Sequence, residues 1–296
     1  MLYKKLAVAT LAVLGLQMAA CIPDDAEETQ KSEAKAAETQ EGDAKAEKAQ
    51  ESDAKAEKAQ ESDAKAEESH GTKHWSYKGD TGPAHWSSLS EKYALCGNGK
   101  QQSPIDIVNS VKTDLPPLEF NYNPIGLTIE NNGHTIKITT DKVGSLTIGE
   151  NTYQLLQFHT HAPSEGAING KQADMVIHMV HQNAQEKLAV VSVYLEKGET
   201  ANPLIDALWK VMPKTPGEPQ QHDVQIDVNQ LLPEDKNYYT FEGSLTTPPC
   251  SEGVKWVILK QTMSISAEQL VQYQAVYPEN ARPLQPLNDR EVFSSN

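Results

Sequence analysis

The sequence predicts a mainly β domain, an α+β fold with a large central, mostly antiparallel twisted sheet and a few short peripheral helices. Two observations support this. From residue 71 onward, short β-prone runs with period-two alternation or short apolar cores are bounded by Gly, Asn or Pro. Helical periodicity appears only in "NPLIDALWKVM" and in "SAEQLVQYQAV", the second of which opens with a serine cap.

The chain begins with a segment typical of a bacterial secretory signal. Two lysines precede an apolar run at 6–16, and small residues follow it. A transmembrane helix is the alternative, but the run is shorter than the roughly 20 apolar residues that a membrane span needs. Cys21 follows "MAA", which resembles the lipobox of bacterial lipoproteins. We therefore expect 1–21 to be a signal peptide with an acylated cysteine, with simple cleavage after Ala20 as the alternative.

Residues 22–70 are predicted to be an acidic, low-complexity Ala/Glu/Lys repeat linker. A ten-residue unit, "DAKAEKAQES", occurs at 43–52 and again at 53–62, and large apolar side chains are missing after Ile22. Such a stretch cannot bury enough apolar surface to offset its ordering entropy. Residues 24–68 carry 16 acidic and 7 basic side chains, a net −9 of the chain's −15. The acidity therefore says little about the substrate, and it argues against nucleic acid as a partner.

These features predict an exported protein of the periplasm, tethered to the outer membrane as a lipoprotein through Cys21. Ile22 favours outer-membrane sorting, because aspartate is missing after the cysteine. The remaining chain, 71–296, is predicted to be one domain, and a homodimer is an open possibility. Its two cysteines, Cys96 and Cys250, predict a disulfide in an exported protein. Two separate buried thiols are the alternative.

The strand that ends in "QFHTH" presents two histidines on one face. Because successive side chains of a strand point to opposite sides, His159 and His161 project together, about 7 Å apart. In "MVIHMVH", His178 and His181 differ by three positions, so only one of them can join the first pair. A set of three histidines leaves a fourth tetrahedral position for water, the arrangement of catalytic zinc. A structural zinc, or a hydrogen-bonded structural role for each histidine, is the alternative.

Eight motifs in order resemble an α-class carbonic anhydrase of the bacterial type. From Trp75 to about Arg282 they are "HWSY", "GPAHW", "QSPIDI", "NNGH", "QFHTHAPSE", "HMVHQN", "GSLTTPPCSEGVKW" and "ARPLQP". The resemblance implies an α-carbonic anhydrase-like fold and an enzyme, a zinc lyase. It implies reversible hydration of carbon dioxide to bicarbonate and a proton, by attack of a zinc-bound hydroxide on CO₂. It makes His159, His161 and His178 the Zn²⁺ ligands.

The same resemblance assigns roles around the metal. Thr246 would accept a hydrogen bond from the hydroxide and donate its own proton to Glu165. His134 would be the proton shuttle, a role that suits a side chain whose pKa lies near neutrality. The CO₂ pocket and the water network would be formed by Val180, Val190, Leu245, Thr247 and Trp256, and by Tyr77 and Asn132. Three alternatives remain: a surface-turn histidine at 134, a plain loop carboxylate at 165, and ordinary core packing for Val180, Val190 and Leu245.

Several positions depart from the family pattern. Val176 stands where the family usually has a glutamate that holds the third ligand, Gly166 where it tends to have histidine, and Phe241 where it has tyrosine. Outer-shell partners typically matter by roughly 10–100-fold in affinity or activity. We therefore expect looser zinc, unless water or a backbone carbonyl caps His178. Lys137 is a further departure that either perturbs the water chain or sits in solvent.

Two other classes of function remain open. One is a non-catalytic binding protein on a carbonic anhydrase-like fold, and the other is a zinc-binding lipoprotein of the periplasm. Both predict a protein that does not hydrate CO₂. Hydration activity measured together with zinc content discriminates between them and the enzyme.

Overall fold

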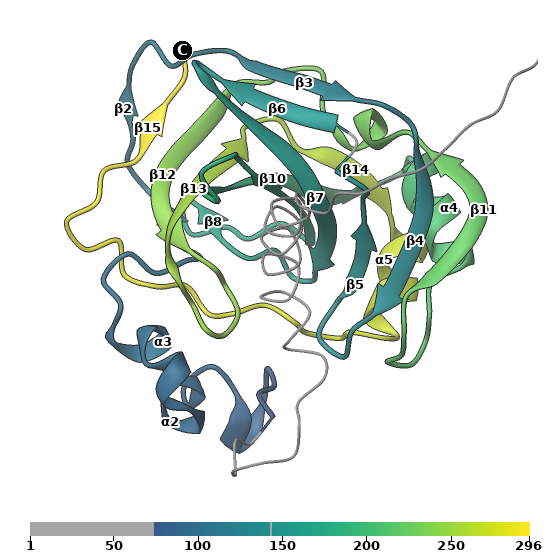
Figure 1. The fold of residues 1–296 in the computed structure, drawn as a ribbon, viewed down its shortest axis with the longest axis horizontal. Coiled ribbons are helices and arrows are strands. Elements are labelled where there is room, and N and C mark those ends of the chain that lie inside the picture. Colours follow the sequence, from purple (N-terminus) through teal and green to yellow (C-terminus); the bar gives the residue numbers. More distant parts are fainter. Residues whose placement is uncertain (1–73, 143) are drawn as a thin grey trace, which may run out of the picture. The chain divides into compact units, whose positions relative to one another are not determined.

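The computed structural model describes residues 74–142 and 144–296, and most of its strands and helices are labelled in Figure 1. The predicted signal peptide, the linker and Cys21 lie outside the described residues. The strands are β1 (Asp106–Ile107), β2 (Val111–Lys112), β3 (Leu118–Tyr122), β4 (Ile125–Asn131), β5 (Ile136–Thr139), β6 (Gly144–Ile148), β7 (Asn151–His161), β8 (Ala167–Ile168), β9 (Met175–Gln182), β10 (Leu188–Gly198), β11 (Gln220–Ile226), β12 (Tyr238–Ser244), β13 (Glu252–Leu259), β14 (Met263–Ser266) and β15 (Phe293–Ser294). The helices are α2 (Trp86–Leu89), α3 (Leu95–Asn98), α4 (Pro203–Lys210) and α5 (Ala267–Gln274), with 3-10 turns η1 (Gly79–Thr81), η2 (Glu91–Tyr93) and η3 (Val228–Leu231).

One 13-stranded sheet dominates the part of the chain that the structure describes. Its main path runs β11-β4-β5-β7-β9-β10-β13-β12-β15-β2, with β3, β6 and β14 attached beside it. Most neighbours are antiparallel, but β10 pairs with β13 and β14 in parallel, and β15 pairs with β2 in parallel. The predicted fold class is confirmed, and the sheet is mixed. Among the described helices we find none with the length and apolarity that a membrane crossing requires.

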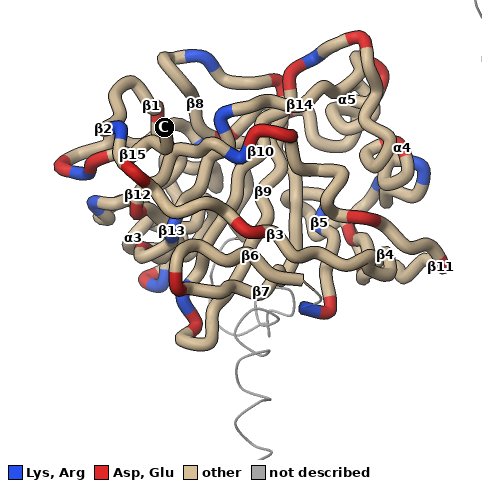
Figure 2. Tube along the Cα trace, turned by 90° about the horizontal axis from the view of Figure 1, so that it is seen from above, with Lys and Arg blue, Asp and Glu red and all other residues tan. Residues whose placement is uncertain are grey.

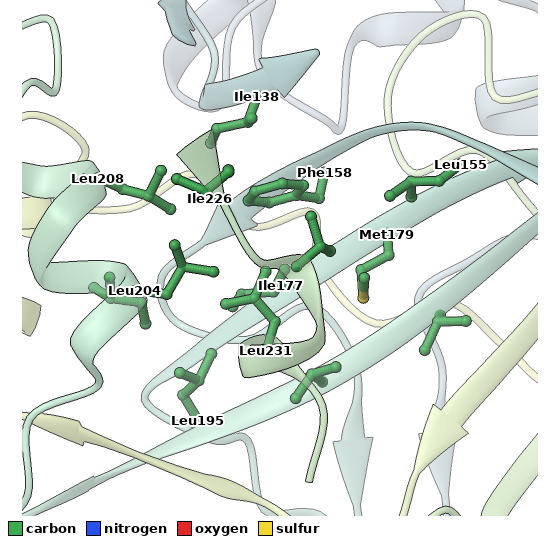
Figure 3. Close-up of a cluster of buried hydrophobic side chains, with 14 of the residues drawn as sticks. Ile138, Leu155, Phe158, Ile177, Met179, Leu195, Leu204, Leu208, Ile226 and Leu231 are labelled. Atoms are coloured by element: carbon green, nitrogen blue, oxygen red, sulfur yellow. The ribbon is translucent and has the colours of Figure 1, made fainter. Parts of the chain in front are cut away.

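The central strand β9 is buried on both faces, and its alternation sorts side chains into two clusters. Ile177 and Met179 belong to the main core, whereas Val176 and Val180 belong to a second, smaller cluster on the other face. Figure 3 shows the main core, where side chains from the sheet and from α4 point toward one another. The second cluster is the one that surrounds the candidate site.

The two helices that the sequence predicts are present and capped. Asn202 accepts hydrogen bonds from two backbone N–H groups at the start of α4, where Pro203 occupies the first turn. Ser266 and Gln269 form a capping box at the start of α5. The two helices pack together, since the Trp209 indole donates to the Gln269 carbonyl at 3.0 Å.

A disulfide joins Cys96 at α3 to Cys250, as the sequence predicts, and it connects positions 154 residues apart. Cys250 lies in the turn between β12 and β13, and its backbone N–H donates to the Thr247 carbonyl at 2.8 Å. The disulfide therefore fastens this turn to the N-terminal part of the domain. Figure 2 shows charged residues of both signs interspersed along the loops and strands of the described part of the chain.

Candidate active site

Three imidazoles converge on one face of the sheet. His159 and His161 come from β7 and His178 from β9, where His178 lies directly opposite His159. Ring centroids are 4.9–5.4 Å apart, and one nitrogen of each ring lies within 4.8 Å of the other two. His181 points to the opposite face, where its Nε2 is 2.7 Å from the Tyr122 hydroxyl. The strand geometry thus decides which histidine of β9 joins the pair on β7.

The two imidazoles on β7 are each held by an acceptor. The Nδ1 of His159 is 2.8 Å from Oε1 of Gln157, which points to the same face of the strand two residues earlier. The Nδ1 of His161 is 2.6 Å from the backbone carbonyl of Asn280. Both contacts fix the ring with Nδ1 as the donor, so Nε2 is the free ligand atom of each.

The imidazole on β9 is different. His178 is 1% exposed, and its Nε2 makes no hydrogen bond with any residue that the structure describes. Its Nδ1 lies 3.9 Å from Oε2 of Glu165, on the side where the three rings meet. Val176, two residues earlier on the same face, supplies no acceptor. His178 therefore presents Nδ1 to the centre and leaves Nε2 without a partner.

Glu165 lies beside the three rings with one oxygen held and one free. Its Oε1 accepts a hydrogen bond from the backbone N–H of Arg282 at 2.7 Å. Its Oε2 is buried without a hydrogen-bond partner among the described residues, 3.7 Å from Nε2 of His161. The carboxylate is thus fixed by a main-chain donor, and its second oxygen is an acceptor aimed at the centre.

The donor set fits a divalent metal ion. The Nε2 of His161 is buried without a partner among the described residues, as a ligand atom would be. Burial is the main cause that lowers the pKa of both His159 and His178 well below the usual range, with added repulsion from the neighbouring rings. Both rings are therefore neutral, the form that binds a metal. A set of three imidazole ligands matches catalytic zinc, which keeps a fourth position for water.

The residues predicted to form an apolar pocket lie together beside His178. Val180, Val190 and Trp256 are buried members of the second cluster, and half-buried Leu245 packs against it. The Trp256 ring meets the His178 ring edge to face, with centroids 5.0 Å apart. The pocket prediction and the core-packing alternative are compatible, because the same side chains do both.

The two threonines predicted for the site lie in the turn between β12 and β13. Thr246 is buried, at 6% exposure, and Thr247 is half-buried. The turn is closed by a hydrogen bond from the Leu245 N–H to the Ser251 carbonyl at 2.9 Å. The turn that contains Thr246 and Thr247 is therefore constrained twice, by this hydrogen bond and by the disulfide at Cys250.

The structure places His134 against aromatic rings. Its imidazole stacks on Trp75 with centroids 3.6 Å apart and planes 8° apart, and His74 stacks at 5.0 Å. Burial and the neighbouring His74 lower the pKa of His134 to about 4. In this position the ring is neutral at pH 7 and lacks the near-neutral pKa that suits a shuttle.

The two residues predicted for the water network have different surroundings. Burial and the nearby Glu165 charge raise the pKa of Tyr77 well above its usual range, and its hydroxyl is buried without a partner among the described residues. The exposed side chain of Asn132 accepts from the N–H groups of His134 and Thr135 at 3.0 and 2.9 Å. Asn132 therefore shapes the turn that carries His134.

The three departures from the family pattern lie together behind the metal ligands. Val176 and Phe241 are buried in the second cluster, and Gly166 adopts a positive φ of 90°. A Cβ at position 166 would lie 2.5 Å from the Tyr194 hydroxyl, so this tyrosine occupies the space of the missing side chain. A small cavity of about 10 Å³ remains beside Gly166 and Phe241. The side chains that line this cavity are mostly apolar, and the Tyr194 hydroxyl donates to the Glu165 carbonyl at 3.4 Å.

Lys137 lies directly opposite His159 on β5, and it is paired. Its Nζ is 2.5 Å from a carboxylate oxygen of Glu130 on β4. Its side chain is about one-third exposed. Lys137 is thus an ion-paired residue at the edge of the site, and its charge contributes to the lowered pKa of His159.

Sequence reasoning missed several residues that hold the site. Gln157 could have been found, because it precedes His159 by two positions and so shares its face. Asn280 and Arg282 contribute a backbone carbonyl and a backbone N–H from an irregular segment. No pattern of side chains in the sequence predicts such contacts.

The chain is similar to known proteins over the same region. A family model of eukaryotic-type carbonic anhydrase matches residues 81–296. A carbonic anhydrase of Klebsiella pneumoniae is 45% identical over 223 residues, covering 74% of this chain and 90% of that protein. One from Neisseria gonorrhoeae is 43% identical over 222 residues, covering 74% and 87%. The solved α-carbonic anhydrase of Thermovibrio ammonificans, in complex with sulfanilamide, is 43% identical with a TM-score of 0.72, covering 74% of this chain and 98% of that one. Fold, site geometry and these similarities agree, and the chain belongs to the eukaryotic-type, or α, carbonic anhydrase family.

Proposed function

We propose that this protein catalyses the reversible hydration of carbon dioxide to bicarbonate and a proton, with Zn²⁺ held by His159, His161 and His178. The observation that carries the proposal is the convergence of the three imidazoles beside the free Oε2 of Glu165. Zinc held by three imidazoles lowers the pKa of water to about 7, which supplies a nucleophile at neutral pH.

Hydrogen bonds and burial hold the ligand histidines in a form that can bind a metal ion. The hydrogen bonds from His159 and His161 to Gln157 and the Asn280 carbonyl fix each tautomer and keep Nε2 free. Burial keeps the His159 and His178 rings neutral, so neither has to lose a proton before the metal binds.

Glu165 and Thr246 would orient the attacking oxygen. The Arg282 N–H occupies Oε1 of Glu165, and Oε2, which has no partner among the described residues, would accept from the Thr246 hydroxyl. A threonine whose proton is committed to a carboxylate can only accept from the attacking oxygen, and this turns a lone pair of that oxygen toward the substrate. The pair thus acts through orientation.

The apolar wall suits CO₂, which makes no strong hydrogen bonds. Val180, Val190, Leu245 and Trp256 supply a surface on which the substrate displaces water at little cost. Half-buried Thr247 is proposed to line the same pocket.

His134 would carry the proton to solvent, with Tyr77 and Asn132 shaping the path. While the ring lies on Trp75, its pKa of about 4 makes it a poor proton acceptor at neutral pH. The proposal therefore requires the imidazole to turn away from Trp75 and toward water when it accepts a proton.

We further propose that the domain 71–296 is exported and anchored to the outer membrane through Cys21 and the linker 22–70. The signal pattern, the lipobox and the disulfide support this proposal. Mass spectrometry of the mature N-terminus tests it, since acylation adds a lipid mass to Cys21 and simple cleavage does not. The homodimer stays a prediction, which the native mass in solution tests.

Stopped-flow CO₂ hydration, measured together with zinc content, tests the proposed function. We expect about one zinc per chain and hydration activity that disappears when a chelator removes the metal. A protein with stoichiometric zinc and no activity would favour a binding role. A protein without zinc and without activity would overturn the proposal.

A further inference from the structure

The distal nitrogen of His178 lacks the contact that a metal-bound imidazole usually has. Such rings almost always donate their other N–H to an outer acceptor, and buried polar groups are rarely left without a partner. Nε2 of His178 is buried and makes no hydrogen bond with any described residue. Because position 176 is a valine, an acceptor has to come from another element.

A second unpartnered polar group lies on the neighbouring strand. Ser192 is 0% exposed, and its Oγ makes no hydrogen bond with any residue of the described ranges. In the ladder between β9 and β10 it stands directly opposite His178. Side chains at such positions share one face, with Cβ atoms about 4.5–5.5 Å apart. A serine hydroxyl can accept from an N–H and still donate its own proton.

Two other groups near His178 are weaker candidates. Tyr194 stands opposite Val176, and its hydroxyl is engaged with the Glu165 carbonyl at the empty side-chain position of Gly166. The Trp256 ring meets the His178 ring edge to face, with planes at 75°, and an aromatic face is only a weak acceptor.

We propose that Ser192 is a positioning residue for the third metal ligand. Rotation of its side chain lets the hydroxyl accept a hydrogen bond from Nε2–H of His178, which fixes that imidazole with Nδ1 toward the metal. The outer contact of the ligand then comes from β10, whereas the family pattern takes it from the ligand's own strand. This inference rests on the proposed function, since it requires His178 to be a ligand.

Zinc affinity of Ser192→Ala tests the inference, with Thr160→Val as the matched control. Thr160 also carries a buried hydroxyl without a partner among the described residues, and it lies between His159 and His161. It pairs with Ile177 and so faces the main core. In competition with a chromogenic chelator, we expect the Kd for zinc to rise about 10-fold or more in Ser192→Ala, and to stay unchanged in Thr160→Val. Equal affinity in wild type and Ser192→Ala overturns the inference.

A second readout separates positioning from general destabilisation. In the zinc-loaded, ¹⁵N-labelled protein, Nε2–H of His178 should give a slowly exchanging imidazole signal that shifts and exchanges faster in Ser192→Ala. Tyr194→Phe should leave this signal and the zinc affinity unchanged. An effect in Tyr194→Phe but not in Ser192→Ala would overturn the assignment to Ser192. A wild-type protein that binds no zinc would instead overturn the proposed function, and the inference with it.

Discussion

The imidazoles on β7 and the imidazole on β9 converge on the same point from different surroundings. On β7, His159 and His161 each donate to an acceptor, at 2.8 and 2.6 Å. On β9, His178 lies between an aliphatic neighbour and an aromatic ring, and its distal nitrogen has no partner among the described residues. One side of the site is held by hydrogen bonds, and the other side is held by packing.

This difference separates two requirements of a metal centre. The strand register alone brings three nitrogens together, because His159 and His178 are direct neighbours in the ladder. Ring orientation is a second requirement, which hydrogen bonds meet on β7. On β9, the orientation of the His178 ring depends on its contact with Trp256 and on the proposed hydrogen bond to the Ser192 hydroxyl. A site can therefore keep its ligands while its outer contacts change.

The largest expected effect comes from removing a ligand on either side. In His161→Ala and in His178→Ala, the affinity for zinc should fall by more than the roughly 10–100-fold that is typical of changes to outer contacts. The rate of CO₂ hydration should fall as the zinc is lost. His181→Ala is the control, because that ring faces away from the site. Zinc per chain after dialysis is the measurement. A His178→Ala protein that keeps stoichiometric zinc would show that β9 supplies no ligand.

A smaller effect should distinguish the outer contacts of the two strands. Gln157→Leu removes the acceptor of His159 with little change in volume, and we expect zinc affinity to fall roughly 10–100-fold. Val176→Ala removes no acceptor from His178, so zinc affinity should stay the same even if folding stability falls. Chelator competition on both variants measures the difference. Equal losses in the two variants would contradict the comparison.

Supplying the missing carboxylate should make the β9 side resemble the β7 side. In Val176→Glu, one oxygen can accept from Nε2–H of His178, so zinc should bind up to about 10-fold more tightly. The other oxygen would be buried in the mostly apolar second cluster, which contains Val176 and Phe241. We therefore expect the free energy of unfolding to fall by about 1–3 kcal/mol. Chelator competition measures the zinc affinity, and denaturant unfolding measures the stability. An unchanged zinc affinity would contradict the expectation that a carboxylate at position 176 holds His178.

The smallest expected effect concerns His134, which also lies on an aromatic ring and not beside an acceptor. Its pKa in the folded protein, about 4, is below the ordinary value of 6.5. The stability that the neutral ring contributes is therefore complete above pH about 6.5 and is lost as the pH falls toward 4. Trp75→Ala should raise this pKa toward 6.5 and make the loss of stability over this range shallower. Titration by NMR checks the pKa, and a value that stays near 4 would show that Trp75 is not the cause.

Much of the fold could be predicted because burial follows simple periods. The alternation of residues in β7 and β9 identified both strands. It also predicted that His178 and His181 point to opposite faces, and His181 points away from the site. The caps at Asn202 and Ser266 marked the two main helices. Strands β3 and β11 were not predicted. The run "LEFNY" is only five residues long and "QQHDVQI" is largely polar, and they form strands by pairing with β6 and β4.

The site could be predicted in its ligands but not in what surrounds them. The three histidines follow from strand geometry together with the family resemblance. The carbonyl of Asn280 and the N–H of Arg282 are main-chain atoms more than 115 residues away from the groups they hold, and any residue type could supply them. The place of Tyr194 depends on cross-strand register, because its hydroxyl fills the space that Gly166 leaves.

The disulfide between Cys96 and Cys250 also links maturation to the redox state of the compartment. The disulfide fastens the turn that contains Thr246. In a chain-entropy model, closing a loop of this length stabilises the folded state by about 4–5 kcal/mol. A chain kept reduced would lack that constraint. Enzyme made in a reducing cytosol would thus remain an immature, easily unfolded precursor until oxidation completes it.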